Sequence, residues 1–298
     1  MIIVEFKGGL GNQMFQYAFY EKLNQMGKNV KGDIVSFYHS VMNDSSGAYR
    51  NVTMRKFELE LFPNICIEQA EAGIREKYER KARNIINRIV GKLIYYRRKV
   101  YRERNLNFDS NVYKLKDGYL SGYWQSPKYF ADIRQVLLEK FTFPELEGDI
   151  NKEYLKKIRE SNSVSIHVRR GDYLTQENKR LFGDICTLEY YGKAIQYFEH
   201  KYQDVVFFVF SNDIEWAKEN LKMRRAIIVE GNEKENAYKD MYLMTQCKHN
   251  IIANSSFSWW GAWLNQNPNQ EVIAPSKWIN IEDVKDIWCE NWMKMEKI

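Results

Sequence analysis

The segment HVRRGDY, residues 167–173, places an imidazole, two guanidinium groups and a carboxylate within six residues. It overlaps the end of an apolar run, 163–168, that predicts a buried strand. Arginine at a strand end suits a diphosphate, because its planar guanidinium gives two charge-assisted hydrogen bonds and stays protonated. We therefore predict that Arg169 binds an anionic ligand, while Arg170 or Asp172 pairs internally and locks the turn.

A second polar run, NSSFS at residues 254–258, follows another apolar run, and a helix is predicted to begin there. Unpaired backbone N–H groups at a helix start bind anions, and serine hydroxyls extend such a site. Simple capping of the helix by Ser255 is the alternative. The cluster of four amide or hydroxyl side chains favours an anion site. Trp259, Trp260 and Trp263 are expected to pack this helix on a sheet.

Two aspartates open other predicted helices. Asp240 lies fifteen residues before Ser255, and its carboxylate could accept hydrogen bonds from the N1 and N2 groups of guanine. Asp213, in the sequence SND, raises the same question. Helix capping is the better explanation of either aspartate when each is taken alone.

The glycine-rich segment GGLGNQ, residues 8–13, could let the backbone approach a ligand while Asn12 and Gln13 hydrogen-bond a sugar. It lacks the GxGxxG spacing of dinucleotide-binding loops and the lysine of a P-loop. The segment therefore fits a substrate loop better than a nucleotide loop.

The elements that must position these residues form an α/β pattern. Residues 2–6 predict a strand, and a glycine turn and a helix follow. In the second half, predicted strands at 163–168, 205–211, 225–231, 249–255 and 271–278 alternate with predicted helices at 187–201, 213–221, 239–248 and after Ser255. Such alternation indicates parallel sheets, which bind ligands beyond the carboxyl ends of their strands. The turn-rich segment 141–149 suggests two domains, residues 1–150 and 151–298.

Composition limits the classes of protein to consider. The chain has 298 residues, 44% of them hydrophobic, and a net charge of +6, which suits an anionic ligand. Its four cysteines form no CxxC pair, so neither a zinc site nor a disulfide framework is expected. No signal peptide and no run of 18 apolar residues is present, which predicts a cytoplasmic location, at most peripheral to the inner face of a membrane.

Residues 75–104 contain twelve Lys or Arg and three Glu, and an apolar stripe predicts that they form a helix. A solvated helix face is one interpretation, and docking on an anionic membrane surface is the other. Nucleic acid is not an expected partner, because the positive charges cluster on one predicted helix without the spread of stacking aromatics that is expected for binding single strands.

Taken together, these segments resemble glycosyltransferase family 11, the α1,2-fucosyltransferases, and bacterial members in particular. The resemblance runs from GGLGNQMFQYA through SGYWQSPKYF and HVRRGDY to SNDIEWAKENL and DMYLMTQCKHNIIANSSFSWWGAWL, nearly the whole chain. It implies a GT-B fold, with two Rossmann-like domains facing each other across a cleft. It also implies inverting transfer of L-fucose from GDP-L-fucose to the 2-hydroxyl of a galactose that ends an oligosaccharide. For bacterial members, a lipid-linked acceptor, as in O-antigen biosynthesis, is a candidate.

The resemblance also implies roles for individual residues. The donor contacts would be His167, Arg169, Arg170, Asp213, Asp240, Asn254, Ser255, Ser256 and Phe257. The acceptor contacts would be Asn12, Gln13, Tyr123 and Trp124, and loop 33–60 would help to select the acceptor. Arg169, Asn12 and a candidate base, Asp172, would carry the chemistry. No cofactor and no metal is expected, since no DxD carboxylate pair stands at a strand end.

Two other functions fit parts of the pattern. A nucleotide-sugar-binding protein without catalysis would keep Asp240 and the serine helix, but it would not need Arg169 at the β-phosphate. A GT-B transferase that uses another GDP-sugar would keep all of these residues.

Overall fold

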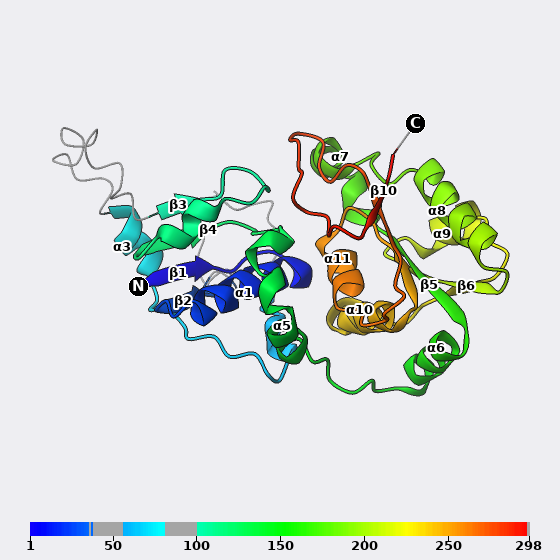
Figure 1. Cartoon of the computed structure of the whole chain (residues 1–298), viewed down its shortest axis with the longest axis horizontal. Coiled ribbons are helices and arrows are strands. Elements are labelled where there is room, and N and C mark those ends of the chain that lie inside the picture. Colours follow the sequence, from blue (N-terminus) through cyan, green and yellow to red (C-terminus); the bar gives the residue numbers. More distant parts are fainter. Residues whose placement is uncertain (36, 38–55, 81–99, 297–298) are drawn as a thin grey trace. The chain divides into compact units, whose positions relative to one another are not determined.

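The computed structural model describes residues 1–35, 37, 56–80 and 100–296, which form two compact units, Met1–Thr142 and Phe143–Ile298 (Figure 1). The division falls inside the segment 141–149 that the sequence suggested as a boundary. Each unit contains a parallel sheet, so the expected α/β class is confirmed. The expectation that the two units face each other across a cleft stays a prediction.

The first unit has a four-stranded sheet with the order β2-β1-β4-β3, in which every neighbouring pair is parallel. Its strands are β1 (Ile2–Glu5), β2 (Val30–Asp33), β3 (Val100–Arg102) and β4 (Gly118–Ser121), and its helices are α1 (Leu10–Gln25), α3 (Ile74–Arg80) and α5 (Arg134–Lys140). Short 3₁₀ helices are η1 (Leu59–Leu61), η3 (Ser110–Lys114), η4 (Pro127–Tyr129) and η5 (Ala131–Ile133). The predicted strand, glycine turn and helix at the start of the chain are confirmed.

The expectation of one helix across residues 75–104 is wrong at its end. Helix α3 stops at Arg80, residues 81–99 lie outside the described part, and Val100–Arg102 form strand β3. Val100 pairs with Tyr119 of β4, so the backbone groups of this short segment bond to a neighbouring strand. A β-branched and an aromatic residue in succession favour this pairing, and the surrounding basic residues conceal it in the sequence.

The second unit has a six-stranded parallel sheet with the order β10-β9-β8-β5-β6-β7. Its strands are β5 (Asn162–Val168), β6 (Val205–Ser211), β7 (Ala226–Ile228), β8 (His249–Ile251), β9 (Val272–Pro275) and β10 (Met293–Met295). Its helices are α6 (Asp149–Glu160), α7 (Gln176–Phe182), α8 (Leu188–Lys201), α9 (Ile214–Asn220), α10 (Ala237–Gln246) and α11 (Ser256–Trp263), with short 3₁₀ helices η6 (Gly171–Leu174) and η7 (Lys234–Asn236). This strand order is that of the doubly wound Rossmann fold.

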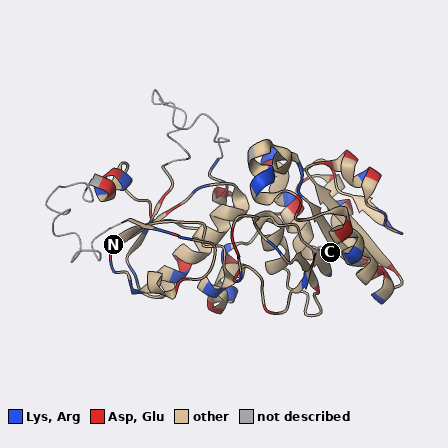
Figure 2. Ribbon diagram, turned by 90° about the horizontal axis from the view of Figure 1, so that it is seen from above, with Lys and Arg blue, Asp and Glu red and all other residues tan. Residues whose placement is uncertain are grey.

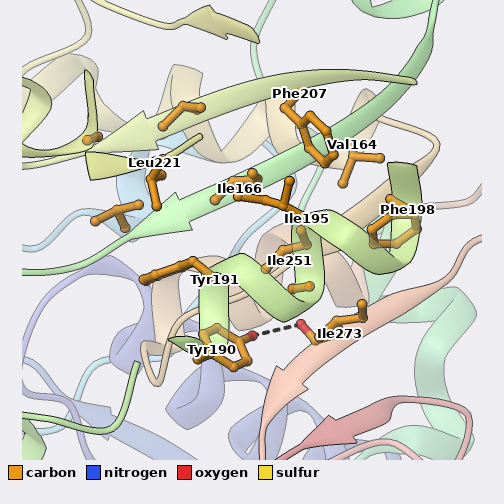
Figure 3. Close-up of a cluster of buried hydrophobic side chains, with 14 of the residues drawn as sticks. Val164, Ile166, Tyr190, Tyr191, Ile195, Phe198, Phe207, Leu221, Ile251 and Ile273 are labelled. Atoms are coloured by element: carbon orange, nitrogen blue, oxygen red, sulfur yellow. Dashed lines mark hydrogen bonds between the residues drawn. The ribbon is translucent and has the colours of Figure 1, made fainter. Parts of the chain in front are cut away.

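Strand β6 shows why helices cover both faces of this sheet. Val205, Phe207 and Val209 pack in the cluster that includes α8, whereas the alternate residues Val206, Phe208 and Phe210 pack with α6 and α10. Successive side chains of a strand point to opposite faces, so a continuous apolar strand must be buried on both. Figure 3 shows the first cluster, where Tyr190 of α8 donates a hydrogen bond to the Ile273 carbonyl over 3.2 Å.

The predicted strands and helices of the second half are confirmed, with one correction. Segment 271–278 was expected to hold the last strand, but β10 follows it and pairs with β9 at the edge of the sheet. Three residues of a mixed Met and Lys pattern carry too little periodicity to be recognised as a strand.

Candidate functional site

The two most polar loops of the second unit leave neighbouring strands at the same edge of the sheet. Ile166 of β5 is paired with Ile251 of β8 in parallel register, and Arg169 and Asn254 each come three residues later. The strand order reverses between β5 and β8, because β6 and β7 lie on one side and β9 and β10 on the other. A reversal of this kind opens the crevice in which doubly wound sheets bind ligands.

His167 is the second-last residue of strand β5, and its buried imidazole is 6% exposed. Its Nδ1 atom has no hydrogen-bond partner within the described part of the protein. Burial, together with the positive charge of Arg169, lowers the pKa of His167 to about 3, so the ring is neutral at physiological pH. Its centroid lies 5.7 Å from that of Phe257, which joins the end of β5 to the first turn of α11.

Arg170 follows the end of β5 and is bound to residues at the start of α9. Its Nε donates to Asp213 over 3.2 Å, and its guanidinium carbon lies 4.0 Å from the centroid of a Trp216 ring. Asp213 also caps α9 by accepting from the Trp216 backbone N–H. These contacts give Arg170 and Asp213 a structural role. Their expected contact with the sugar donor stays a prediction.

Tyr173 links the loop after β5 to the loop after β8. Its hydroxyl donates to the Asn254 carbonyl over 3.0 Å, its ring stacks on Phe182, and the Arg169 guanidinium carbon lies 5.6 Å from the ring centroid. No role was predicted for this tyrosine from the sequence. The signal was present, because an aromatic residue directly after two arginines can orient a guanidinium through a cation–π contact.

The start of α11 has the geometry of an anion site. Ser255 is the N-cap and accepts from the Phe257 N–H, while Ser256 is the first helical residue and is partly exposed. The Asn254 amide is buried and donates to the carbonyls of Phe182 and Trp278. Asn254 therefore supports the loop, and the serines and backbone N–H groups remain the parts that could bind a phosphate.

Asp240 lies in the first turn of α10, a helix that packs against α11. Asn232 donates to its Oδ1 over 2.8 Å. Burial raises the pKa of Asp240 to about 7, although the Asn232 hydrogen bond lowers it. A carboxylate that is held in this way is suited to the N–H donors of a ligand, because such donors stabilise its charged form.

The glycine loop of the first unit fixes Asn12 tightly. Gly8 has a φ of +82°, and a Cβ at that position would lie 2.8 Å from Asn12 Nδ2. Gln125 donates from Nε2 to Asn12 Oδ1 over 2.7 Å. The Asn12 carbonyl oxygen is therefore fixed toward Gln125 and its amide N–H groups are directed away from it, so these N–H groups are the part that could reach a ligand.

Gln13 and Trp124 do not lie where an acceptor sugar can touch them. Both side chains are 0% exposed. Gln13 bonds to Gly8, Lys56 and Glu58, and Trp124 stacks on Phe19 at 4.3 Å between centroids. We therefore correct their role to support of the loop, whereas Tyr123, at 37% exposed, remains available to an acceptor.

A buried ion cluster that the sequence analysis missed lies at the end of β1. Glu5 is 6% exposed and receives Lys7 at 3.0 Å, Arg75 at 2.8 Å and the Ser121 hydroxyl. Burial alone would raise the pKa of Glu5, but these partners together hold it below its usual value. The carboxylate is thus charged and fully paired, which makes it a support for the loop rather than a base.

Some predicted features fall outside the described structure. The placement of the Asp172 side chain is not described, so its role as a base stays a prediction. The same holds for residues 38–55 of the proposed acceptor loop and residues 81–99 of the basic segment.

The described part of the basic segment is charge-paired. Arg75 bonds to Glu5 and Glu79, Glu79 also receives Arg102, and acidic and basic residues are interspersed along the described ribbon (Figure 2). Among the described helices, none has the length and apolar character needed to cross a membrane. Docking on an anionic membrane surface stays a prediction.

The sheet order and the reversal between β5 and β8 define a doubly wound α/β protein. The chain belongs to glycosyl transferase family 11, whose model matches residues 1–296. It is 33% identical to an alpha-1,2-colitosyltransferase of Escherichia coli, covering 100% of this chain and 99% of that protein. It is 34% identical to the O-antigen biosynthesis glycosyltransferase WbnK of Escherichia coli, over 97% and 98% of the two chains. A galactoside alpha-(1,2)-fucosyltransferase 1 of Leontopithecus chrysomelas is 31% identical over 49% of this chain and 42% of its own length.

Proposed function

We propose that this glycosyltransferase moves L-fucose, or a closely related 6-deoxy sugar, from a GDP-sugar to the 2-hydroxyl of a galactose residue, with inversion. The observation that carries the proposal is the position of Arg169 and the Ser255–Ser256 helix start beyond the paired strands β5 and β8. Similarity to both colitosyl and fucosyl relatives supports an α1,2 linkage and a donor of this type.

Arg169 and the start of α11 would stabilise the leaving diphosphate. As the bond to the sugar breaks, negative charge develops on the β-phosphate, and fixed cationic and N–H groups stabilise it more than they stabilise the ground state. One such group contributes about 3 kcal/mol or more to the barrier reduction. His167 stays neutral, so its contribution would be a hydrogen bond from the unpartnered imidazole rather than a charge.

On the acceptor side, Asn12 would donate a hydrogen bond from its amide to an acceptor or sugar oxygen. The Asn12 side chain is a neutral amide of very low basicity, and its carbonyl already accepts from Gln125, so Asn12 is not suited to take the proton of the attacking hydroxyl. Asp172 remains the candidate for that role. We further propose that the transfer needs no metal ion, which activity in the presence of EDTA would support.

The choice of donor can be tested by direct competition. Colitose lacks the 3-hydroxyl of fucose, and a site that hydrogen-bonds a hydroxyl rejects the analogue without it by about 10⁴-fold. The purified protein would receive equal GDP-fucose and GDP-colitose with a β-galactoside, and the products would be separated by mass. Transfer of either sugar supports the proposal, whereas transfer of neither, with galactosides of several kinds, would refute it.

A further inference from the structure

Two buried asparagines of the second unit hydrogen-bond to each other in both directions. Asn151 Nδ2 donates to Asn232 Oδ1 over 3.0 Å, and Asn232 Nδ2 donates to Asn151 Oδ1 over 2.7 Å. Asn151 is 4% exposed and lies in the first turn of α6, while Asn232 is 7% exposed and lies between β7 and α10. Both ends of the Asn232 amide are bonded, so its orientation is fixed.

Asn232 uses its second N–H on Asp240. The distance from Nδ2 to Asp240 Oδ1 is 2.8 Å, so three segments are joined: the start of α6, the loop after β7 and the start of α10. Gly231, with a φ of +91°, turns the chain directly before Asn232. Residues that carry a side chain rarely adopt this backbone conformation, so a glycine at position 231 allows the chain to turn and Asn232 to point inward.

The network leaves Asp240 able to accept further hydrogen bonds. Among the described residues, Asn232 is the only side chain that donates to this carboxylate. Guanine presents two adjacent donors, N1–H and the 2-amino group, which match a carboxylate held in one orientation. Adenine presents an acceptor at N1, which a carboxylate repels.

We propose that Asn232, locked by Asn151, is a positioning residue that sets the Asp240 carboxylate to select guanine over adenine. This inference rests on the proposed GDP-sugar donor and adds the residues that give the base selection. An asparagine that merely stabilises the fold would affect all nucleotides alike, whereas a positioning residue changes the preference between two bases.

The test is calorimetric titration of the full chain with GDP and with ADP. Asn232→Ala should weaken GDP binding by about tenfold, since a hydrogen bond to a charged group is lost, and should leave ADP binding within about twofold. Asn151→Ala keeps the contact to Asp240 but frees Asn232, so it should shift the same preference by about threefold. Asn236→Ala is the control, because this nearby side chain makes no cap hydrogen bond.

The outcomes separate this inference from the function on which it rests. Equal losses for GDP and ADP in both asparagine variants would overturn the positioning role. A different outcome is that Asp240→Ala loses the preference for GDP over ADP while the two asparagine variants keep it. That result would refute the positioning role of Asn232, but it would support the recognition of guanine by Asp240. If Asn232→Ala does not fold, the ratio of GDP affinity to ADP affinity in Asn151→Ala decides the question alone. Failure of the unchanged protein to bind GDP would instead refute the proposed donor.

Discussion

Gln125 donates a hydrogen bond from Nε2 to Oδ1 of Asn12 over 2.7 Å, across 113 residues of sequence. The bond joins the loop after β4 to the first turn of α1. It engages the only acceptor atom of the Asn12 side chain, and so fixes the orientation of the amide and leaves its donor side for a ligand.

This bond makes Gln125 a positioning residue for the proposed transfer. Gln125→Ala should lower kcat by about 2- to 10-fold, which corresponds to the loss of one neutral hydrogen bond. Binding of GDP, measured by calorimetry, should not change. Gln25→Ala, which alters an exposed glutamine of the same unit, should leave both quantities as they are. Loss of GDP affinity in Gln125→Ala would contradict the assignment.

Gly8 and Gly27 form a matched pair for testing how the turn at Gly8 fits against Asn12. Both have positive φ, +82° and +72°, but only Gly8 has a neighbour that an added Cβ would strike. Alanine at either position should cost about 1 kcal/mol of folding free energy from the strained backbone. Only Gly8→Ala should also lower kcat, because Asn12 must move. Thermal melts and initial rates would measure both effects, and equal rates in the two variants would argue against a role for Asn12.

Arg169 and Arg170 should separate chemistry from stability. Arg169→Ala should lower kcat by about 10²-fold or more, because the leaving diphosphate loses its cation. Arg170→Ala should instead lower stability by about 1 kcal/mol, since it loses a partly exposed ion pair and a ring contact. For both variants, the turnover rate per folded molecule would be measured, with the folded fraction taken from a thermal melting curve. The reverse pattern would exchange the two roles.

Binding of the donor should depend on pH through Asp240. Its pKa is about 7 in the free protein, so the group is largely protonated below that pH. Guanine donors favour the charged form, which lowers the pKa in the complex. The affinity for GDP-fucose, whose diphosphate diester does not titrate near pH 7, should be constant above pH 7 and should fall as the pH drops below it.

Asp240→Asn gives the control for this pH dependence. The profile of the variant should be flat, and its affinity should be low at every pH. Because the pKa of Asp240 is raised in the folded protein, the protein loses stability as the pH rises through that pKa. The Asp240→Asn variant does not have this titration. Its melting temperature at pH 8 should therefore be higher than that of the unchanged protein. A flat profile in the unchanged protein would exclude Asp240 as the group that reads the base.

Local patterns predicted much of the fold, and they predicted that Arg169 and Ser255 lie at one edge of the sheet. The β6 run of seven residues, VVFFVFS, can only be a doubly buried strand, and Asp213 was recognisable as the start of α9. The edge formed by Arg169 and Ser255 followed from the rule that parallel strands bind ligands at their carboxyl ends.

The parts that escaped prediction depend on contacts between distant residues. Asn151 and Asn232 are separated by 81 positions, and nothing near either one signals that they pair. Trp124 looked like a sugar-binding aromatic, but its burial against Phe19 depends on how α1 and the loop after β4 pack. Strand β3 was hidden because pairing with β4 overrides the local helical pattern of a basic segment.

The most direct test of the proposed function is the structure of the product. The purified protein would be incubated with GDP-fucose and EDTA and with lactose, N-acetyllactosamine or galactosyl-β1,3-GalNAc, and the linkage would be read by NMR. The account predicts an α-fucoside on the 2-hydroxyl of galactose. A β-fucoside, a linkage to another hydroxyl, or transfer that stops when EDTA is added would contradict it.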